Sequence, residues 1–122
     1  MSRYILRVAT GVGTEQAFFV LTALADTPRH GYGIVREVAE ASEGRVRLKV
    51  GTLYGVLERL VAGGLVELDR EEIHSGRLRR YYRLTESGRQ SLLADIARQE
   101  ANARLATQRL RAWRPAPAGG IA

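Results

Sequence analysis

Apolar residues recur at helical spacing in three segments of the first half of the chain. The spacing predicts helices over residues 14–25, 32–43 and 51–62, with Thr14 capping the first and glycines ending the second and third. Apolar and basic residues alternate over residues 46–50, which is typical of a short half-buried strand. Alternating segments over 65–69 and 79–84 flank a polar stretch centred on Ser75 and Gly76, so they predict a β-hairpin.

A long helix is expected to follow, capped by Thr85 and running to about residue 113. Residues spaced alternately by four and three form an a/d seam along it: Leu92, Ile96, Gln99, Ala103, Ala106, Leu110 and Trp113. About 27 residues of helix would extend roughly 40 Å, farther than one small domain can cover. We therefore expect the matching helix of a second copy to cover the seam. Trp113 is expected to pack there, with a role in lining a pocket between protomers as the alternative.

The order helix, helix, short strand, helix, hairpin is that of a winged helix-turn-helix domain. The predicted fold is mainly α with a small β-hairpin. We expect a winged-helix domain over residues 1–84, a C-terminal dimerisation helix over 85–114 and a disordered tail over 115–122. Residues 1–13 are weakly patterned, and the sequence assigns them no role.

Composition narrows the possible partners. Lys and Arg total 19 against 13 Asp and Glu, a formal net charge of +6 that favours nucleic acid or an anionic membrane surface, with solubility alone as the alternative. The absence of Cys removes disulfides, thiolate metal sites and Cys nucleophiles. No apolar run approaches the ~20 residues that span a bilayer. Residues 4–9 are too short and too charged for a signal peptide. We expect a cytoplasmic protein without membrane contact.

Three segments carry a family resemblance. Residues 30–35 read HGYGIV, residues 51–60 read GTLYGVLERL followed by GLV at 64–66, and residues 80–88 read RYYRLTESG. In this order and spacing they resemble the PadR family of bacterial regulators. Lys49 and Val50 stand where the family often has Ser/Thr-Pro, which leaves Thr52 as the expected cap of the third helix. Gly33 replaces the family's Glu.

The resemblance implies a sequence-specific DNA-binding transcriptional regulator. We expect a repressor that binds an inverted repeat of double-stranded DNA as a homodimer and is released by a small aromatic effector. The alternative is a winged-helix module that contacts proteins without reading DNA. No nucleophile with a base and an orienting group is visible, so neither an enzyme nor a cofactor is expected.

The third helix is the expected major-groove reader. Its outward side and the residue before it supply the candidate DNA contacts Lys49, Gly51, Thr52, Tyr54, Gly55 and Arg59. The glycines would let the DNA backbone approach closely, and the free N–H groups of the helix start would favour a phosphate. Two alternatives stay open: Tyr54 could plug the core between helices, and Arg59 could pair with Glu58.

The hairpin carries the densest positive charge, with Arg77, Arg79, Arg80 and Arg83 and no acid among them. We expect Arg77, Arg79 and Arg80 to contact the minor groove or its flanking phosphates. Alternation places Arg77 and Arg79 on one side and Arg80 on the other. The alternative is a solvated edge strand protected by charge.

The two histidines do not suggest a metal site. His30 is expected to start the second helix, and His74 to lie in an exposed loop, without acidic partners at ligand spacing. Glu71 and Glu72 are adjacent and so point in different directions, which makes a poor acid/base pair. The sequence therefore predicts no metal ion.

Overall fold

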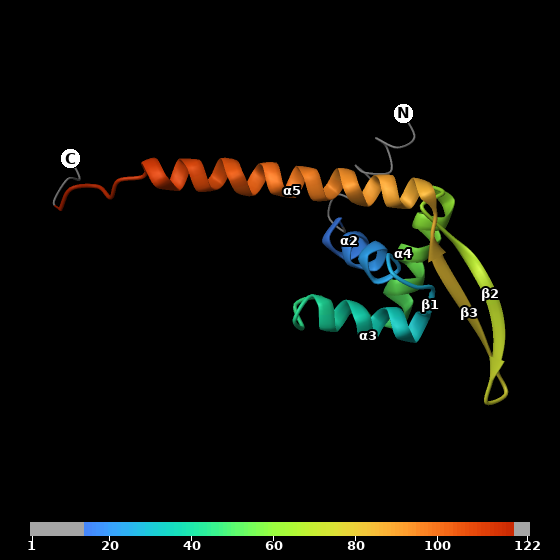
Figure 1. Cartoon of the computed structure of the whole chain (residues 1–122). Helices are drawn as coiled ribbons and strands as arrows, with labels where there is room; N and C mark the ends of the chain where they lie inside the picture. Colours follow the sequence, from blue (N-terminus) through green and yellow to red (C-terminus); the bar gives the residue numbers. More distant parts are fainter. Residues whose placement is uncertain (1–13, 119–122) are drawn as a thin grey trace.

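A computed structural model describes residues 14–118 (Figure 1). Its elements are α2 (Thr14–Ala23), β1 (Arg29–His30), α3 (Gly31–Ala41), α4 (Val50–Ala62), β2 (Val66–His74), β3 (Arg77–Leu84) and α5 (Glu86–Ala112). The first three helices bundle together, the hairpin projects from them, and α5 runs across the bundle and beyond it. The predicted winged-helix fold, mainly α with a small β-hairpin, is confirmed.

The core lies between α2, α3 and α4 and is closed by the base of the hairpin. It is built from apolar side chains at helical spacing, among them Val20, Leu21, Ile34, Val38, Leu53, Leu57 and Leu60. Each fully buried side chain of this size contributes about 1.5–3 kcal/mol relative to exposure. Val66 from β2 and Leu92 from α5 join the same cluster, so the hairpin and the last helix are anchored to the bundle.

The sheet has three antiparallel strands in the order β1-β3-β2. Ser75 and Gly76 both have positive φ, 51° and 76°, the requirement of a two-residue type I′ turn. The hairpin tip is therefore where the sequence predicts it. The strands are longer than expected because a two-residue turn lets pairing continue up to the tip. β1, two residues long, was not predicted, since so short a strand carries no alternating pattern.

The predicted strand over residues 46–50 is wrong. Val46 and Leu48 are buried and Arg47 and Lys49 exposed, as the alternation implies, but the segment is an extended loop that pairs with no strand of residues 14–118. The backbone N–H of Val46 instead donates to the Ser42 hydroxyl at 2.9 Å. A loop lying on a core also buries every second side chain, so the pattern alone did not distinguish the two.

Helix α4 begins at Val50, and its N-cap is Lys49 in extended backbone conformation, with no side-chain cap hydrogen bond. Thr52 lies inside the helix, so the prediction that it is the cap is wrong. An ammonium group has no lone pair to accept from the first N–H groups.

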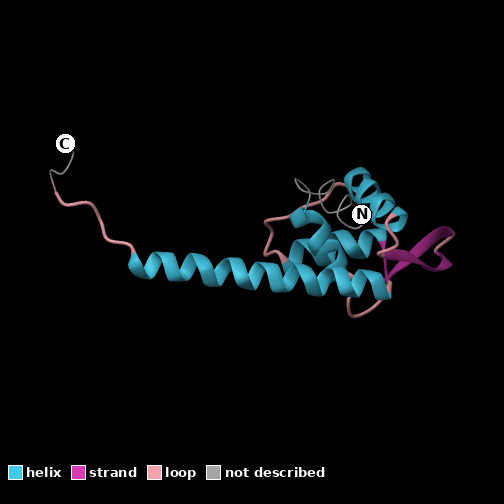
Figure 2. Ribbon diagram, turned by 90° about the horizontal axis from the view of Figure 1, so that it is seen from above, coloured by secondary structure: helices cyan, strands magenta, loops and turns pink. Residues whose placement is uncertain are grey.

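The N-terminus of α5 is fastened to the bundle. The Gly88 N–H donates to the Thr85 hydroxyl at 3.0 Å, and that hydroxyl donates to the Gly64 carbonyl at 2.6 Å, which confirms the predicted cap. From residue 99 onward every described α5 residue is exposed, and the helix extends well beyond the bundle (Figure 2). Residues 1–13 and residues 119–122, half of the predicted tail, lie outside the described residues.

Candidate nucleic-acid interface

The first turns of α4 present an almost bare surface. Gly51 and Thr52 are exposed and Gly55 is half-buried, whereas Leu53 and Leu57 point into the core as predicted. A methyl group added at either glycine would meet no atom within 4 Å. Nothing in residues 14–118 therefore requires glycine at these positions, although each glycine costs helix stability. The space they leave faces outward.

Positive charge surrounds the start of this helix. The first N–H groups of α4 lack a side-chain partner, so they carry the positive end of the helix dipole. Arg47 and Lys49 are exposed beside them and form no ion pair among residues 14–118. Arg45 differs, because it pairs with Glu15 at 3.1 Å. Arg59 is exposed, and within the described chain it forms no ion pair with Glu58 or any other acid.

The sequence predicts that Tyr54 contacts DNA, with a place in the core between helices as the alternative. Its side chain is 45% exposed, so it is not a core plug. Its hydroxyl nevertheless contacts the start of α3, because a Cβ added at Gly31 would lie 2.8 Å from that oxygen. Tyr54 thus ties α4 to α3 while keeping one edge at the surface.

The wing is less positive than its β3 sequence suggests. Arg80 pairs with Glu71 at 2.9 Å, and Arg83 pairs with Glu67 at 2.7 Å and Asp69 at 3.1 Å. These acids lie on β2, directly across the hairpin. The local sequence around the arginines does not reveal these acids, because they lie opposite the arginines on the other strand and not among them. The turn at residues 75–76 fixes the register and would have predicted the first pair.

Arg77 and Arg79 remain as the wing's available cations. Neither forms an ion pair with any acid in the part of the chain that the structure describes. They lie on one face of β3, and Arg80 lies on the other, as the alternation predicts. The structure therefore places Arg77 and Arg79 together and separates Arg80 from them.

A further arginine of the wing, Arg70 on β2, contacts both an aromatic ring and two acids. The Arg70 guanidinium lies 4.0 Å from the centroid of the Tyr81 ring and donates to Asp69 and Glu72, at 2.7 Å each. The hydrogen bond from Arg70, together with one from Arg83, holds the pKa of Asp69 below its usual range. The mixed cluster stiffens the middle of the wing without adding net positive charge.

The predicted seam of α5 divides into two parts. Leu92 is buried in the core of the winged-helix domain, so the exposed part of the seam begins at Ile96, which is 38% exposed. Leu110 and Trp113 are 70% and 63% exposed. Gln99, Ala103 and Ala106 lie between them and are exposed as well. Large apolar side chains in water along a fastened helix favour burial against another surface.

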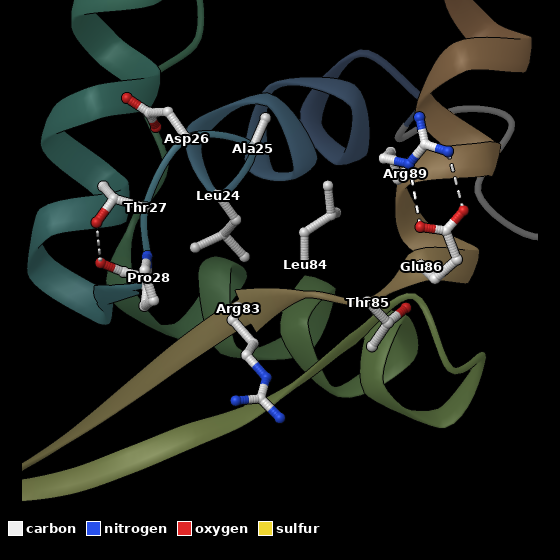
Figure 3. A pocket seen from close by; sticks show the side chains of 10 residues that line it. All are labelled: Leu24, Ala25, Asp26, Thr27, Pro28, Arg83, Leu84, Thr85, Glu86 and Arg89. Atoms are coloured by element: carbon white, nitrogen blue, oxygen red, sulfur yellow. Dashed lines mark hydrogen bonds and ion pairs between the residues drawn. The ribbon is translucent and has the colours of Figure 1, made fainter.

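An open cleft of about 350 Å³ lies where the end of α2 meets the junction of β3 and α5 (Figure 3). Leu24 and Leu84 form its apolar floor, and Arg89 at its edge pairs with Glu86 at 3.0 Å. The other charged lining residues, Asp26 and Arg83, also have ion-pair partners. Among the described residues, the cleft therefore offers no unpaired ion. Among the described residues, no group of three or more His, Asp or Glu side chains is placed to hold a metal ion.

His30 is the N-cap of α3, as predicted, and its Nδ1 accepts from the Gly33 N–H at 3.3 Å. His74 ends β2 and is not in a loop, although it is exposed. No helix in the described range combines the length and apolar character needed to cross a membrane.

Known proteins match both the sequence and the fold. Residues 20–94 match the Transcriptional regulator PadR-like family. The chain is 38% identical to Transcriptional regulator Rv3488 of Mycobacterium tuberculosis over 85 residues, covering 70% of this chain and 76% of that protein. A PadR family transcription regulator from Clostridium difficile has 28% identity and a TM-score of 0.66, covering 77% of this chain and 96% of that one.

Bacillus subtilis PadR, solved in complex with operator DNA, shares the fold at 24% identity and a TM-score of 0.60, over 66% of this chain and 47% of that one. The family match spans more than half of the chain and includes the recognition-type helix and the whole wing. The chain belongs to the PadR-like family of transcriptional regulators.

Proposed function

We propose that this protein is a sequence-specific DNA-binding repressor that acts as a homodimer on an inverted repeat. One observation carries the proposal: the uncapped start of α4, with its two bare glycines, lies in the same small domain as a wing whose Arg77 and Arg79 have no acidic partner among the described residues. Bare helix surface suits close approach to a groove, and unpaired arginines suit phosphates.

In this proposal the start of α4 lies in the major groove of the DNA, and the wing follows the adjacent sugar-phosphate backbone. The contacts come from Lys49, Gly51, Thr52, Tyr54, Gly55 and Arg59, and from Arg77, Arg79 and Arg80. Arg80 contributes least, because Glu71 already neutralises it. Bacillus subtilis PadR, which has a similar fold, is solved in complex with operator DNA, and this supports DNA as the partner.

Dimerisation rests on the exposed seam of α5. A two-fold pair would place two recognition helices about 34 Å apart, on successive major-groove faces of one duplex side. The exposed Leu110 and Trp113 would then be buried, and each large apolar side chain so covered contributes about 1.5–3 kcal/mol.

A planar aromatic effector is part of the same proposal. Trp113 is the only tryptophan of the chain and is 63% exposed at the end of α5. Its ring could stack on a flat aromatic molecule at the interface between two copies. Quenching of its fluorescence by such a molecule, together with release of the duplex, is the expected result; fluorescence and binding that do not respond to a panel of aromatic acids would refute this part.

The alternative, a module that contacts proteins without reading DNA, has one observation in its favour. Ile73 and Leu78 face each other near the wing tip and are 77% and 56% exposed. The salt dependence of binding separates the two functions, because only a wing that neutralises DNA phosphates should bind with an affinity that falls steeply with salt.

The test measures binding to a duplex selected from random oligonucleotides, as a function of salt. The logarithm of the affinity should fall linearly with the logarithm of salt concentration, by about 0.9 per phosphate neutralised. Arg77→Ala combined with Arg79→Ala should shallow that slope by about 1.8, whereas the matched control Arg104→Ala on the exposed part of α5 should leave it unchanged. A selection that enriches no sequence, or a salt-independent affinity, would refute DNA recognition.

The dimer is tested by truncation after Arg98. A cut after Ser91 would also remove Leu92 from the core, so it would confuse loss of the dimer with loss of the fold. The shorter chain should sediment as a folded monomer and bind the selected duplex much more weakly. A truncated chain that keeps the mass and affinity of the full chain would refute the role of the seam.

A further inference from the structure

The exposed seam of α5 reaches from the edge of the bundle to the end of the helix. Leu92 is buried against the bundle, whereas the seam residues from Ile96 to Leu110 and the C-cap Trp113 are exposed. Figure 2 shows this part of α5 extending away from the bundle. A second copy that covers the seam could run along it in the same direction or in the opposite one, and the charges beside the seam distinguish the two.

These flanking charges have opposite signs at the two ends of the seam. In the heptad pattern, the positions directly beside the seam hold Asp95 and Glu100 near the bundle, and Arg109 and Arg114 at the far end. Glu100 and Arg109 form no ion pair within the described chain, and Asp95 contacts Arg98 of its own helix through one carboxylate oxygen. One end of the seam is therefore flanked by acids and the other by bases.

Parallel pairing would place like charges together. In a parallel coiled coil, a residue just before a seam position faces the residue five positions later on the other helix. Asp95 would then face Glu100 of the second copy, and Arg109 would face Arg114. Two-fold symmetry repeats both contacts, so every charged pair beside the seam would be repulsive.

One antiparallel register covers the whole exposed seam. Ile96 would lie opposite Trp113 of the second copy, and Ala103 opposite Ala106, so that small residues meet at the centre and let the two helices approach closely. Because α5 ends at Ala112, the second helix would stop where the bundle of the first copy begins. The length of the helix thus matches the length of the seam that is free to be covered.

We propose that two copies of the chain pair through α5 as an antiparallel coiled coil in this register. Asp95 then lies opposite Arg109 of the second copy, and Glu100 lies opposite Arg114, so every charged pair beside the seam is attractive. The proposal rests on the homodimer proposed above and specifies the direction and register in which its two helices meet.

This register also spaces the two DNA-binding domains suitably. Each domain is anchored to α5 at Leu92. The two anchors lie about 25 helix positions apart along the common axis, or about 38 Å at 1.5 Å per residue. This spacing is close to the roughly 34 Å between successive major-groove faces. A parallel pair would hold the two anchors side by side, about 8–10 Å apart.

The first experiment measures the dimer dissociation constant of the full chain by sedimentation equilibrium at low salt. Arg109→Glu should raise this constant about tenfold, because it turns two attractions to Asp95 into repulsions. In a parallel dimer the same substitution would remove the repulsion between Arg109 and Arg114 and lower the constant. Arg104→Glu is the matched control: it makes the same change of charge at an exposed position away from the seam, and it should change the constant little. Thermal unfolding of each variant checks that the fold is intact.

A second arm reads the register from cross-links, because the chain has no Cys of its own. Gln99→Cys combined with Leu110→Cys should give a disulfide-linked dimer on oxidation, since the two positions face each other across the proposed pair. Gln99→Cys alone should not, because its two copies would lie about 16 Å apart along the axis.

A dimer that Arg109→Glu strengthens, or that Gln99→Cys alone cross-links, would overturn the antiparallel arrangement and leave the homodimer and DNA recognition standing. A dimer that neither cysteine variant cross-links would overturn the register. A native chain that sediments as a monomer would overturn the proposed homodimer as well.

Discussion

Replacing Gly55 by Ala should stabilise the free protein and weaken its complex with DNA. Gly55 lies in the interior of α4, where glycine costs about 1 kcal/mol relative to alanine. A methyl group added there would meet no atom of the described residues within 4 Å, so no clash offsets the gain. The free energy of unfolding should therefore rise by about 1 kcal/mol per protomer, and the melting temperature by roughly 3–6 °C.

The same methyl group would stand between α4 and the DNA. Overpacking a close-fitting contact costs about 1–3 kcal/mol, which corresponds to a loss of affinity between roughly fivefold and 150-fold. Gly51→Ala should behave alike, because its surroundings are equally open. Calorimetry on the free protein and fluorescence anisotropy with the selected duplex measure the two effects separately.

Asn102→Ala is the matched control, since it improves helix propensity on the exposed part of α5 without touching the proposed interface. It should stabilise the protein by a few tenths of a kcal/mol and leave DNA affinity unchanged. If Gly55→Ala raises stability and binds the duplex as tightly as the native protein, the close approach of α4 to DNA is refuted.

Three further predictions test the fold, the histidine cap and the wing. Gly88→Ala should destabilise the protein by about 3 kcal/mol in urea unfolding, because a Cβ there would lie 2.1 Å from the Leu65 carbonyl oxygen. The control Ser87→Ala, at an exposed position, should change the stability little. Similar unfolding midpoints for the two variants would contradict the close packing at Gly88. The lowered pKa of His30 contributes stability that is present above about 6.5 and is lost as pH falls through the lower folded-state pKa. His30→Asn keeps a side-chain acceptor at the cap, so its stability should depend less on pH between about 7.5 and 5.5, and parallel curves for the two proteins would speak against the assignment. Arg80→Ala should reduce operator affinity less than Arg79→Ala does, because only Arg80 is neutralised by Glu71; the reverse order in anisotropy titrations would show that the duplex lies on the other face of the wing.

Features that depend on a few neighbouring residues could be predicted from the sequence. Helical spacing located α2, α3, α4 and α5 to within a few residues, and the Ser-Gly pair located the hairpin tip, because periodicity and positive φ are properties of short segments. The Thr85 and His30 caps followed for the same reason, since each hydrogen bond spans three residues. The motifs that resemble the PadR family lie in these segments, so the fold class could be predicted as well.

Charge pairing was decided only by the tertiary structure. The sequence shows no acid among Arg77, Arg79, Arg80 and Arg83. Antiparallel pairing nevertheless brings acids of β2 against Arg80 and Arg83, and it leaves Arg77 and Arg79 without an acidic partner among the described residues. The strand predicted just before α4 is an extended loop in the structure. A strand requires a hydrogen-bonded neighbouring strand, and the alternation of apolar and polar residues does not indicate whether one is present. Electrostatic energy depends on distance through space, and that distance is set by packing and not by order along the chain.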